Sequence, residues 1–161
     1  ATPDVIGVEL AGCAKNAAAL AAAAAGHAGP NAAGSAAGKV FAEVESYARV
    51  AGSAPGTFAG LAGAGDLVAT VLAVESRARR AGELLAQGVA GDAIEPILGQ
   101  TAEAVHCVPL LADRVNAAGV DAPVLRGLAN LIEGTVAPDR WTASLTAPRP
   151  NAAKREKVKV A

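Results

Sequence analysis

Aromatic residues are almost absent from this chain of 161 residues, which has two Phe, one Tyr and one Trp. The interior must therefore be filled by aliphatic side chains. Ala and Gly are abundant, and each alanine buries little area. We therefore expect helices to approach one another closely. A chain of this length fits one domain with a sizeable core.

The chain also lacks a strong net charge and a long apolar run. A formal charge of −1 gives no general electrostatic reason to bind nucleic acid or an anionic membrane. The longest apolar tract, 17–25, is far shorter than the roughly 20 residues that a membrane span needs. No secretory signal pattern is found at Ala1. We therefore expect a cytoplasmic protein that neither binds nucleic acid nor inserts into a membrane.

Residues that commonly bind metals are few, with two Cys and two His. Cys13 and Cys107 lie in predicted helices without metal-ligand spacing, which favours reduced structural thiols over a disulfide. His27 and His106 are isolated, so we predict no metal site. Met is absent, including at the first position, and we expect the chain to be a fragment or a processed form.

Strand-like alternation is not sustained anywhere, so we predict an all-α fold. Helical spacing and capping signals predict helices at about 4–25, 32–51, 57–61, 66–73, 76–88, 101–118, 123–132 and 138–145, with one or two turns at 92–98. These elements form one predicted domain, residues 1–146. Residues 147–161 are basic and contain Pro, and we predict a disordered tail there.

Lys15 and Asn16 interrupt a predicted helix made largely of Ala. The neighbours of Lys15 three and four positions away are all small: Ala11, Gly12, Ala18 and Ala19. A ligand or another backbone can therefore approach this Lys closely. A Lys from which water is excluded loses its charge more easily and can serve as a general base. An ordinary exposed Lys is the alternative.

Asp66 follows a Gly-Ala-Gly turn and precedes a predicted helix, so an N-cap is its ordinary role. Thr70 is four residues further and lies on the same helical face. Together they could orient a Lys ammonium and bind a substrate hydroxyl. The two roles of Asp66 are compatible, because a cap uses only part of a carboxylate's acceptor capacity.

Arg77 comes directly after Ser76 at the start of another predicted helix. Free N–H groups at a helix N-terminus and a planar guanidinium together favour a phosphate or carboxylate site. A solvated surface charge is the alternative for Arg77, and is the expected fate of at least one of Arg79 and Arg80.

Four stretches resemble, in the same order, one known family: GVELAGCAKNAAAL, NAAGSAAGKVFAE, FAGLAGAGDLVATVLAVESRARRAGELLAQG, and GQTAEAV with GVDAPVLRGL. The chain resembles, over about residues 4–145, the C-terminal domain of the bacterial-type NAD(P)-dependent glycerol-3-phosphate dehydrogenases. The resemblance implies a multi-helical domain similar to the C-terminal domain of 6-phosphogluconate dehydrogenase. It also implies an N-terminal Rossmann domain, absent from this chain, that binds most of the NAD or NADP.

The resemblance implies a role for each residue that matches the catalytic pattern. Lys15 matches the general acid/base that exchanges a proton with the C2 hydroxyl of sn-glycerol 3-phosphate or the carbonyl of dihydroxyacetone phosphate. Asn16 matches its neighbour in the substrate pocket. Asp66 and Thr70 match the residues that position the Lys and the substrate hydroxyls. The isolated chain is expected to be inactive, because its cofactor domain is missing.

The resemblance further implies a phosphate and cofactor region. Arg77 matches the Arg that binds the substrate phosphate and also contacts the cofactor, with Ser76 and Ala78 beside it in the substrate site. Glu103 matches an acidic residue in a loop that approaches the cofactor.

The chain departs from the family pattern at several positions. Ala78 and Ala104 stand where the family has Asn and Gly, and Lys39 and Ala33 each replace an Arg. The loop 26–30 is short. We expect these changes to affect substrate affinity more than reaction type.

Two alternatives remain open at this stage. One is the helical domain of a related dehydrogenase, acting on β-hydroxyacids or ketopantoate. The other is a non-catalytic dimerisation module. A stripe of small residues would suit close packing, including a homodimer contact: Gly7, Ala11, Ala18, Ala22 and Ala25.

Overall fold

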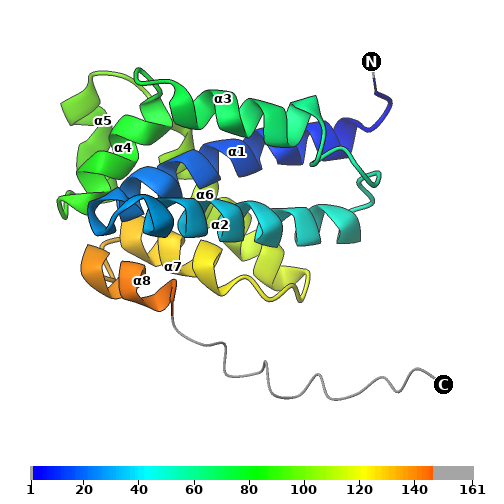
Figure 1. The fold of residues 1–161 in the computed structure, drawn as a ribbon. Helices are drawn as coiled ribbons and strands as arrows, with labels where there is room; N and C mark the ends of the chain where they lie inside the picture. The colour runs from blue at the N-terminus through cyan, green and yellow to red at the C-terminus, as the bar shows by residue number, and fades with distance from the viewer. Residues whose placement is uncertain (1, 147–161) are drawn as a thin grey trace.

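Helix α1 (Val5–Ala25) runs through the middle of the domain in the computed structural model, which describes residues 2–146 (Figure 1). Helix α2 (Pro30–Val50) packs along it, and α3, α4 and α6 pack around it. All residues of 17–25 except Ala23 are buried, and all but one of those buried residues are Ala. The scarcity of large side chains thus places the nearly all-alanine C-terminal part of α1, residues 17–25, at the centre.

The remaining elements complete an all-α fold, which confirms the predicted fold class; residues 2–146 contain no strand. In order they are a 3₁₀ turn (Gly26–Ala28), a π-helical turn η2 (Leu61–Gly65), α3 (Asp66–Leu72), α4 (Arg77–Ala86), α5 (Gly91–Leu98), α6 (Glu103–Ala117), α7 (Pro123–Ile132) and α8 (Pro138–Ser144). The predicted tail, 147–161, lies outside the described residues.

The short helix predicted for 57–61 is wrong, and so is the isolated turn predicted at 63–65. The chain makes hydrogen-bonded turns at 55–59 and then a π-helical turn, η2, that continues directly into α3. Gly63 permits this path, because a Cβ there would lie 2.1 Å from the carbonyl oxygen of Phe58. Single π-helical turns are often found at functional sites.

Helices α1 and α4 approach so closely that only glycine fits at one position between them. A Cβ on Gly82 would lie 2.3 Å from the carbonyl oxygen of Leu20 and 2.7 Å from the Cβ of Ala23. Contact at this separation gains dispersion energy over many small atoms, which offsets the absence of large side chains. The position of α4, and of the residues at its N-terminus, therefore depends on the small residues of α1.

Two acidic side chains hold helix ends in place. Glu43 on α2 is buried and accepts hydrogen bonds from the backbone N–H groups of Val124 (3.2 Å) and Leu125 (2.8 Å) at the start of α7. A carboxylate at a helix N-terminus satisfies free N–H groups and complements the helix dipole. Asp4 does the same for α1 by accepting from the N–H of Gly7 at 2.9 Å.

Asp4 also ties the start of α1 to the loop that follows α2. It accepts hydrogen bonds from Ser53 Oγ (3.1 Å), the Ala54 N–H (2.9 Å) and Thr57 Oγ1 (2.6 Å). This loop leads into the turns before η2, so the network anchors the path of the chain toward Asp66.

Helix α1 with the following turn, Val5–Ala28, is long and apolar enough to cross a membrane by length and composition. The apolar tract 17–25 is only part of this segment, which is therefore longer than the sequence-based prediction allowed. Its packing against α2, α3, α4 and α6 is that of a core helix. Core helices of globular domains pass the same test, so the segment is weak support for a membrane span.

We expect Gly82→Ala to destabilise the domain by about 1–3 kcal/mol, because the added methyl group forces α4 away from α1. Urea denaturation followed by circular dichroism measures the change. Gly38→Ala in α2 is the control, because a Cβ there meets nothing within 4 Å. It should stabilise the domain by about 0.5–1 kcal/mol. Equal effects of the two substitutions would contradict the close packing of α1 and α4.

The Asp4 network predicts a specific loss of stability in acid. Its hydrogen bonds, that from Thr57 first, lower the Asp4 pKa below the ordinary value of 3.8. The stabilisation is therefore complete above that value and is lost as the pH falls through the folded-state pKa. As the pH falls through this range, Asp4→Asn should lose less stability than the wild type. Asp121→Asn, in an exposed loop, is the control and should lose as much stability as the wild type. Parallel curves for wild type and Asp4→Asn in acid denaturation would disprove the role of the network.

Candidate active site

Lys15 and Asp66 form an ion pair that joins α1 to α3. The Lys15 side chain is 22% exposed and that of Asp66 is 45% exposed. The alanines around Lys15 on α1, among them Ala14 and Ala18, are fully buried. Lys15 is therefore a basic side chain next to buried alanines, and it is directed toward α3 by a carboxylate far away in the sequence.

Asp66 does not cap α3, so the ordinary N-cap role expected for it is wrong. The N-cap position is Gly65, and no side chain caps this helix, because η2 runs directly into α3. The Asp66 carboxylate is thus available for Lys15. Thr70 lies one turn on, where its Oγ1 donates to the carbonyl oxygen of Asp66 at 2.7 Å.

The N-terminus of α4 presents free backbone donors beside a guanidinium group. Ser76 is the N-cap, and its Oγ accepts from the Arg79 N–H at 3.4 Å. The N–H groups of Arg77 and Ala78, in the first turn, have no partner within the helix. Arg77 donates to the carbonyl oxygen of Thr101 at 3.1 Å. This arrangement suits an anion, as the sequence predicted.

Glu103 lies 3.8 Å from the Arg77 guanidinium, measured from Oε1 to Nη2. It is the first residue of α6 and so lies in the helix predicted at 101–118, although the family residue that it matches is in a loop. Both side chains are largely exposed, 48% for Arg77 and 67% for Glu103. An ion pair this exposed contributes little to stability, so both side chains remain available to bind a ligand.

A cavity of about 370 Å³ brings most of the predicted substrate and cofactor residues together. Its lining residues are Asn16, Ala69, Thr70, Ala73, Glu75, Ser76, Arg77, Ala78, Glu103 and Ala104. Lys15 is the sequence neighbour of Asn16, and Asp66 lines a second hollow that shares Ala69 with this cavity. Asp66 therefore lines the hollow next to the cavity, and its ion pair brings the Lys15 side chain beside it.

Sequence reasoning missed Glu75, which lines the cavity next to Ser76. Its place in the segment VESR, two residues before Arg77, is the signal that could have identified it. A carboxylate here adds negative charge close to the anion donors of α4. Any anion that binds has to do so against Glu75 and Glu103.

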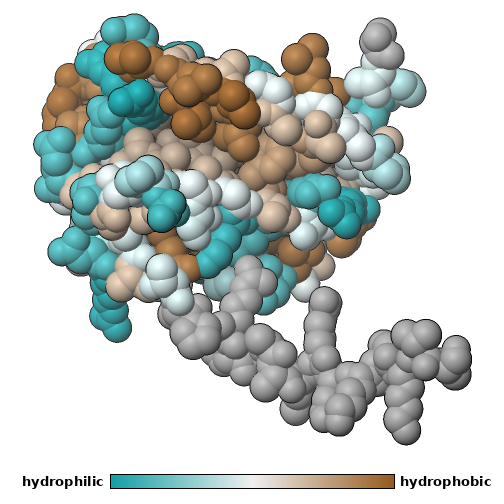
Figure 2. All heavy atoms as spheres, in the orientation of Figure 1, coloured by the Kyte–Doolittle hydropathy of each residue, from teal (hydrophilic) through white to brown (hydrophobic). Residues whose placement is uncertain are grey.

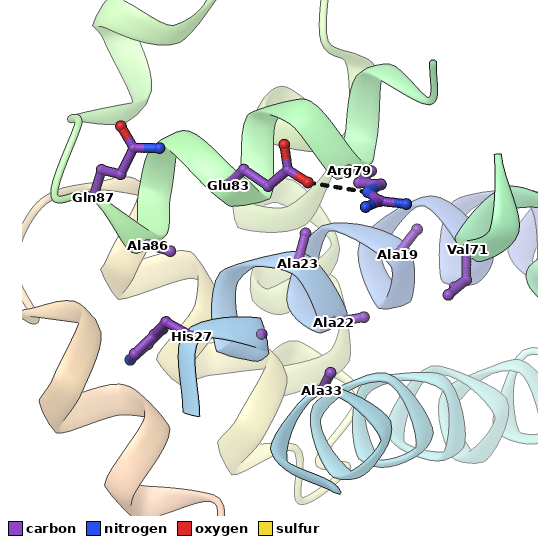
Figure 3. A pocket seen from close by; sticks show the side chains of 11 residues that line it. Ala19, Ala22, Ala23, His27, Ala33, Val71, Arg79, Glu83, Ala86 and Gln87 are labelled. Atoms are coloured by element: carbon purple, nitrogen blue, oxygen red, sulfur yellow. Dashed lines mark hydrogen bonds and ion pairs between the residues drawn. The ribbon is translucent and has the colours of Figure 1, made fainter. Parts of the chain in front are cut away.

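A separate cavity of about 530 Å³ lies beyond Lys15 along α1 (Figure 3). Alanines of α1, α2 and α4 form its walls, and Arg79 pairs with Glu83 at 3.0 Å on its edge. Ala33 and Gly26, from the regions where the chain departs from the family pattern, also line it. It contains none of the predicted site residues, so it is not the predicted active site.

The described residues hold no group of three or more His, Cys, Asp or Glu side chains arranged for a metal ion. Each His instead has an acidic neighbour. His27 Nε2 lies 3.2 Å from Asp139, and His106 Nε2 lies 2.9 Å from Glu95.

Comparisons with known proteins agree with the resemblance read from the sequence. The family model described as NAD-dependent glycerol-3-phosphate dehydrogenase C-terminus matches residues 4–143. A glycerol-3-phosphate dehydrogenase (NAD(P)+) of Variovorax paradoxus is 37% identical over 93% of this chain and 45% of its own length. The enzyme of the same name from Polaromonas naphthalenivorans is 34% identical over 93% of this chain and 43% of its own length.

A solved structure shares the fold. The crystal structure of glycerol-3-phosphate dehydrogenase from Coxiella burnetii superimposes with a TM-score of 0.82 at 28% identity, covering 89% of this chain and 45% of that one. The chain thus spans less than half the length of these relatives. Sequence and structure together show that the chain belongs to the NAD-dependent glycerol-3-phosphate dehydrogenase family and corresponds to its C-terminal domain.

Proposed function

We propose that this chain is the substrate-binding and catalytic part of an NAD(P)-dependent glycerol-3-phosphate dehydrogenase of the cytoplasm. The reaction would interconvert sn-glycerol 3-phosphate and dihydroxyacetone phosphate. The observation that carries the proposal is the Lys15–Asp66 ion pair beside a cavity lined by Arg77 at a helix N-terminus. Such a site combines a proton-transfer group with an anion-binding group, and the reaction needs both.

Lys15 is the residue that we assign to proton transfer. Nicotinamide, when bound, accepts or supplies the hydride. The Lys15 Nζ takes the proton from the C2 hydroxyl of the alcohol, or gives it to the carbonyl oxygen in the reverse direction. Asp66 orients the Lys15 amine from α3, and Thr70 fixes the Asp66 backbone through its hydroxyl.

Arg77 and the first N–H groups of α4 are the phosphate-binding candidates. A guanidinium has five donors, of which the Thr101 carbonyl takes one, so several remain for phosphate oxygens. Ala78 is buried and offers only its backbone N–H, since no side-chain donor stands where the family has Asn. Loss of one hydrogen bond to an anion lowers affinity by about 1.5–3 kcal/mol if nothing replaces it.

Arg77 and Glu103 would hold the cofactor at this surface. Both side chains are exposed at the cavity, and their charges suit the phosphates and hydroxyls of a dinucleotide. Residues 2–146 offer no Gly-rich turn after a strand, so most of the NAD or NADP contacts would come from another domain.

The surface of α3 supports a covering domain of this kind. Hydrophobic residues gather on the face where α3 lies (Figure 2). Val68 and Leu72 of α3 are exposed, and so are Leu61 of η2 and Val74 just after α3. A contiguous exposed apolar patch is typical of an interaction surface. Because Asp66 belongs to the same helix, a domain that covers this face would also exclude water from Lys15.

The proposed function predicts that activity requires the cofactor-binding domain as well as this one. The 161-residue chain should not oxidise NADH with dihydroxyacetone phosphate, whereas the full-length protein that contains it should. Dihydroxyacetone without its phosphate, and β-hydroxyacids, should be poor substrates. Activity of the isolated chain, or a preference of the full-length protein for unphosphorylated substrates, would contradict the proposal. No activity of the full-length protein on any phosphorylated triose would favour a non-catalytic module.

The second prediction concerns proton transfer. In the full-length protein, Lys15→Ala should lower kcat by about two to four orders of magnitude, because it removes the acid/base group. Lys15→Arg is the matched control, since it keeps the charge beside Asp66 but cannot give up its proton, and it should be equally slow. Steady-state kinetics measures both, and near-normal turnover in either variant would remove Lys15 from the mechanism.

The third prediction concerns the phosphate. Arg77→Ala should raise KM for dihydroxyacetone phosphate roughly tenfold or more while changing kcat less, because charge-assisted hydrogen bonds to the anion are lost. Arg80→Ala, on the same helix but outside the cavity lining, should leave KM within about twofold. An unchanged KM in Arg77→Ala would require a different phosphate site.

A further inference from the structure

Helix α5 packs firmly against the core and carries the Glu95 side chain beside the start of α6. Ile94, the residue before Glu95, is fully buried. At the beginning of α5, a Cβ on Gly91 would lie 2.6 Å from the carbonyl oxygen of Ile132, so α5 lies very close to the end of α7. These contacts fix α5 in place, and the Glu95 carboxylate, whose side chain is 31% exposed, has a defined position.

Glu95 binds the backbone where α6 begins. Its Oε1 accepts a hydrogen bond from the Ala102 N–H at 2.9 Å and lies 2.9 Å from His106 Nε2. Ala102 is the N-cap residue of α6 and is fully buried. The Ala102 N–H, and after it His106, hold the pKa of Glu95 below its ordinary value of 4.5. The acceptor is therefore an ionised carboxylate at neutral pH, and hydrogen bonds to a charged acceptor are the stronger kind.

The peptide group that Glu95 binds also binds Arg77. The N–H of Ala102 and the C=O of Thr101 belong to the same peptide unit, and Arg77 Nη1 donates to that C=O at 3.1 Å. In a trans peptide these two groups point in opposite directions from one rigid plane. Glu95 and Arg77 therefore bind the peptide unit from opposite sides. A rotation of the plane that breaks the Glu95 hydrogen bond also turns the carbonyl oxygen away from Arg77.

We propose that Glu95 is a positioning residue, which holds the Arg77 guanidinium in place through the Thr101–Ala102 peptide unit. Glu95 is not among the residues that line the cavity of about 370 Å³, so its effect on a ligand there passes through Arg77. Without Glu95, the buried Ala102 N–H loses its acceptor, which favours rotation of the peptide unit. Arg77 then loses its backbone anchor and becomes more mobile.

The consequence for substrate binding rests on the proposed function, in which Arg77 binds the substrate phosphate. A guanidinium that is already ordered binds an anion more tightly than one that has to be ordered during binding. The positioning of Arg77 by Glu95 is a property of the chain itself, so it is measurable without substrate or cofactor.

Nuclear magnetic resonance on the 161-residue chain tests the positioning directly. In the wild type, the Ala102 N–H should exchange with solvent at least roughly tenfold more slowly than in an unfolded peptide. The heteronuclear NOE of the Arg77 Nε–Hε group should be that of an ordered side chain. Glu95→Ala should bring the Ala102 exchange rate toward the unfolded rate and lower the Arg77 NOE. Glu95→Gln keeps an acceptor oxygen and should retain both wild-type values.

Three results of these measurements would overturn the proposal. One is an Ala102 N–H in the wild type that exchanges as fast as in an unfolded peptide, which needs no variant. Another is an Arg77 NOE that is the same in the wild type and in a folded Glu95→Ala variant, with folding checked by circular dichroism. The third is a Glu95→Gln variant that behaves like Glu95→Ala, because the charge and not the hydrogen bond would then matter.

Steady-state kinetics of the full-length protein tests the consequence for the phosphate. Glu95→Ala should raise KM for dihydroxyacetone phosphate about threefold to tenfold and change kcat less. Glu95→Gln should stay within about twofold of the wild type. In the Arg77→Ala background, Glu95→Ala should add no further increase, because both substitutions remove the same contact. Glu45→Ala is the matched control: Glu45 is 33% exposed and pairs with Arg49 on α2, and its loss should leave KM within about twofold.

The two backgrounds separate a failure of this inference from a failure of the proposed function. If Glu95→Ala raises KM by the same factor with and without Arg77→Ala, Glu95 acts on another group and the inference is wrong. If Arg77→Ala by itself leaves KM unchanged, the proposed phosphate site is wrong, and the exchange and NOE measurements decide whether Glu95 positions Arg77.

Discussion

The close packing that alanine permits around α1 is the constraint on which the rest of the domain depends. With almost no aromatic residue available, the core is built by bringing helices together until backbone lies against backbone, as at Gly82 against the Leu20 carbonyl group. The same contacts fix where α3, α4 and α6 begin relative to α1. Lys15, Asp66, Arg77 and Glu103 belong to these four helices, so the geometry of the candidate site follows from core packing.

Both cations that we assign to the site already have carboxylate partners: Lys15 pairs with Asp66, and Arg77 lies near Glu103. These pairs orient the side chains before any ligand binds. Exposed ion pairs contribute about 0–1 kcal/mol, so a substrate anion can compete for the Arg77 guanidinium at little cost. The side chains of the site are therefore preoriented and still accessible to a ligand. A domain lying on the apolar face of α3 would strengthen both ion pairs by excluding water.

Local signals in the sequence were sufficient for most of the helices and insufficient for the contacts between them. Pro123 and Gly134 bracket α7, whose observed bounds match the prediction. The π-helical turn before Asp66 was missed, because it depends on Gly63 passing close to Phe58 rather than on any local propensity. The resemblance supplied the residue roles, and the structure adds that Lys15 and Asp66 are in contact.

Chemical rescue of Lys15→Ala in the full-length protein tests the central claim, proton transfer by the Lys15 amine, most directly. Small primary amines of similar size and different basicity would be added while the reduction of dihydroxyacetone phosphate is followed in a single turnover. If Lys15 moves the proton, the variant should accelerate with amine concentration, and the effect should vary with amine basicity, whereas the wild type should not respond. A hydride-transfer rate in Lys15→Ala that already equals the wild-type rate without amine would contradict the account.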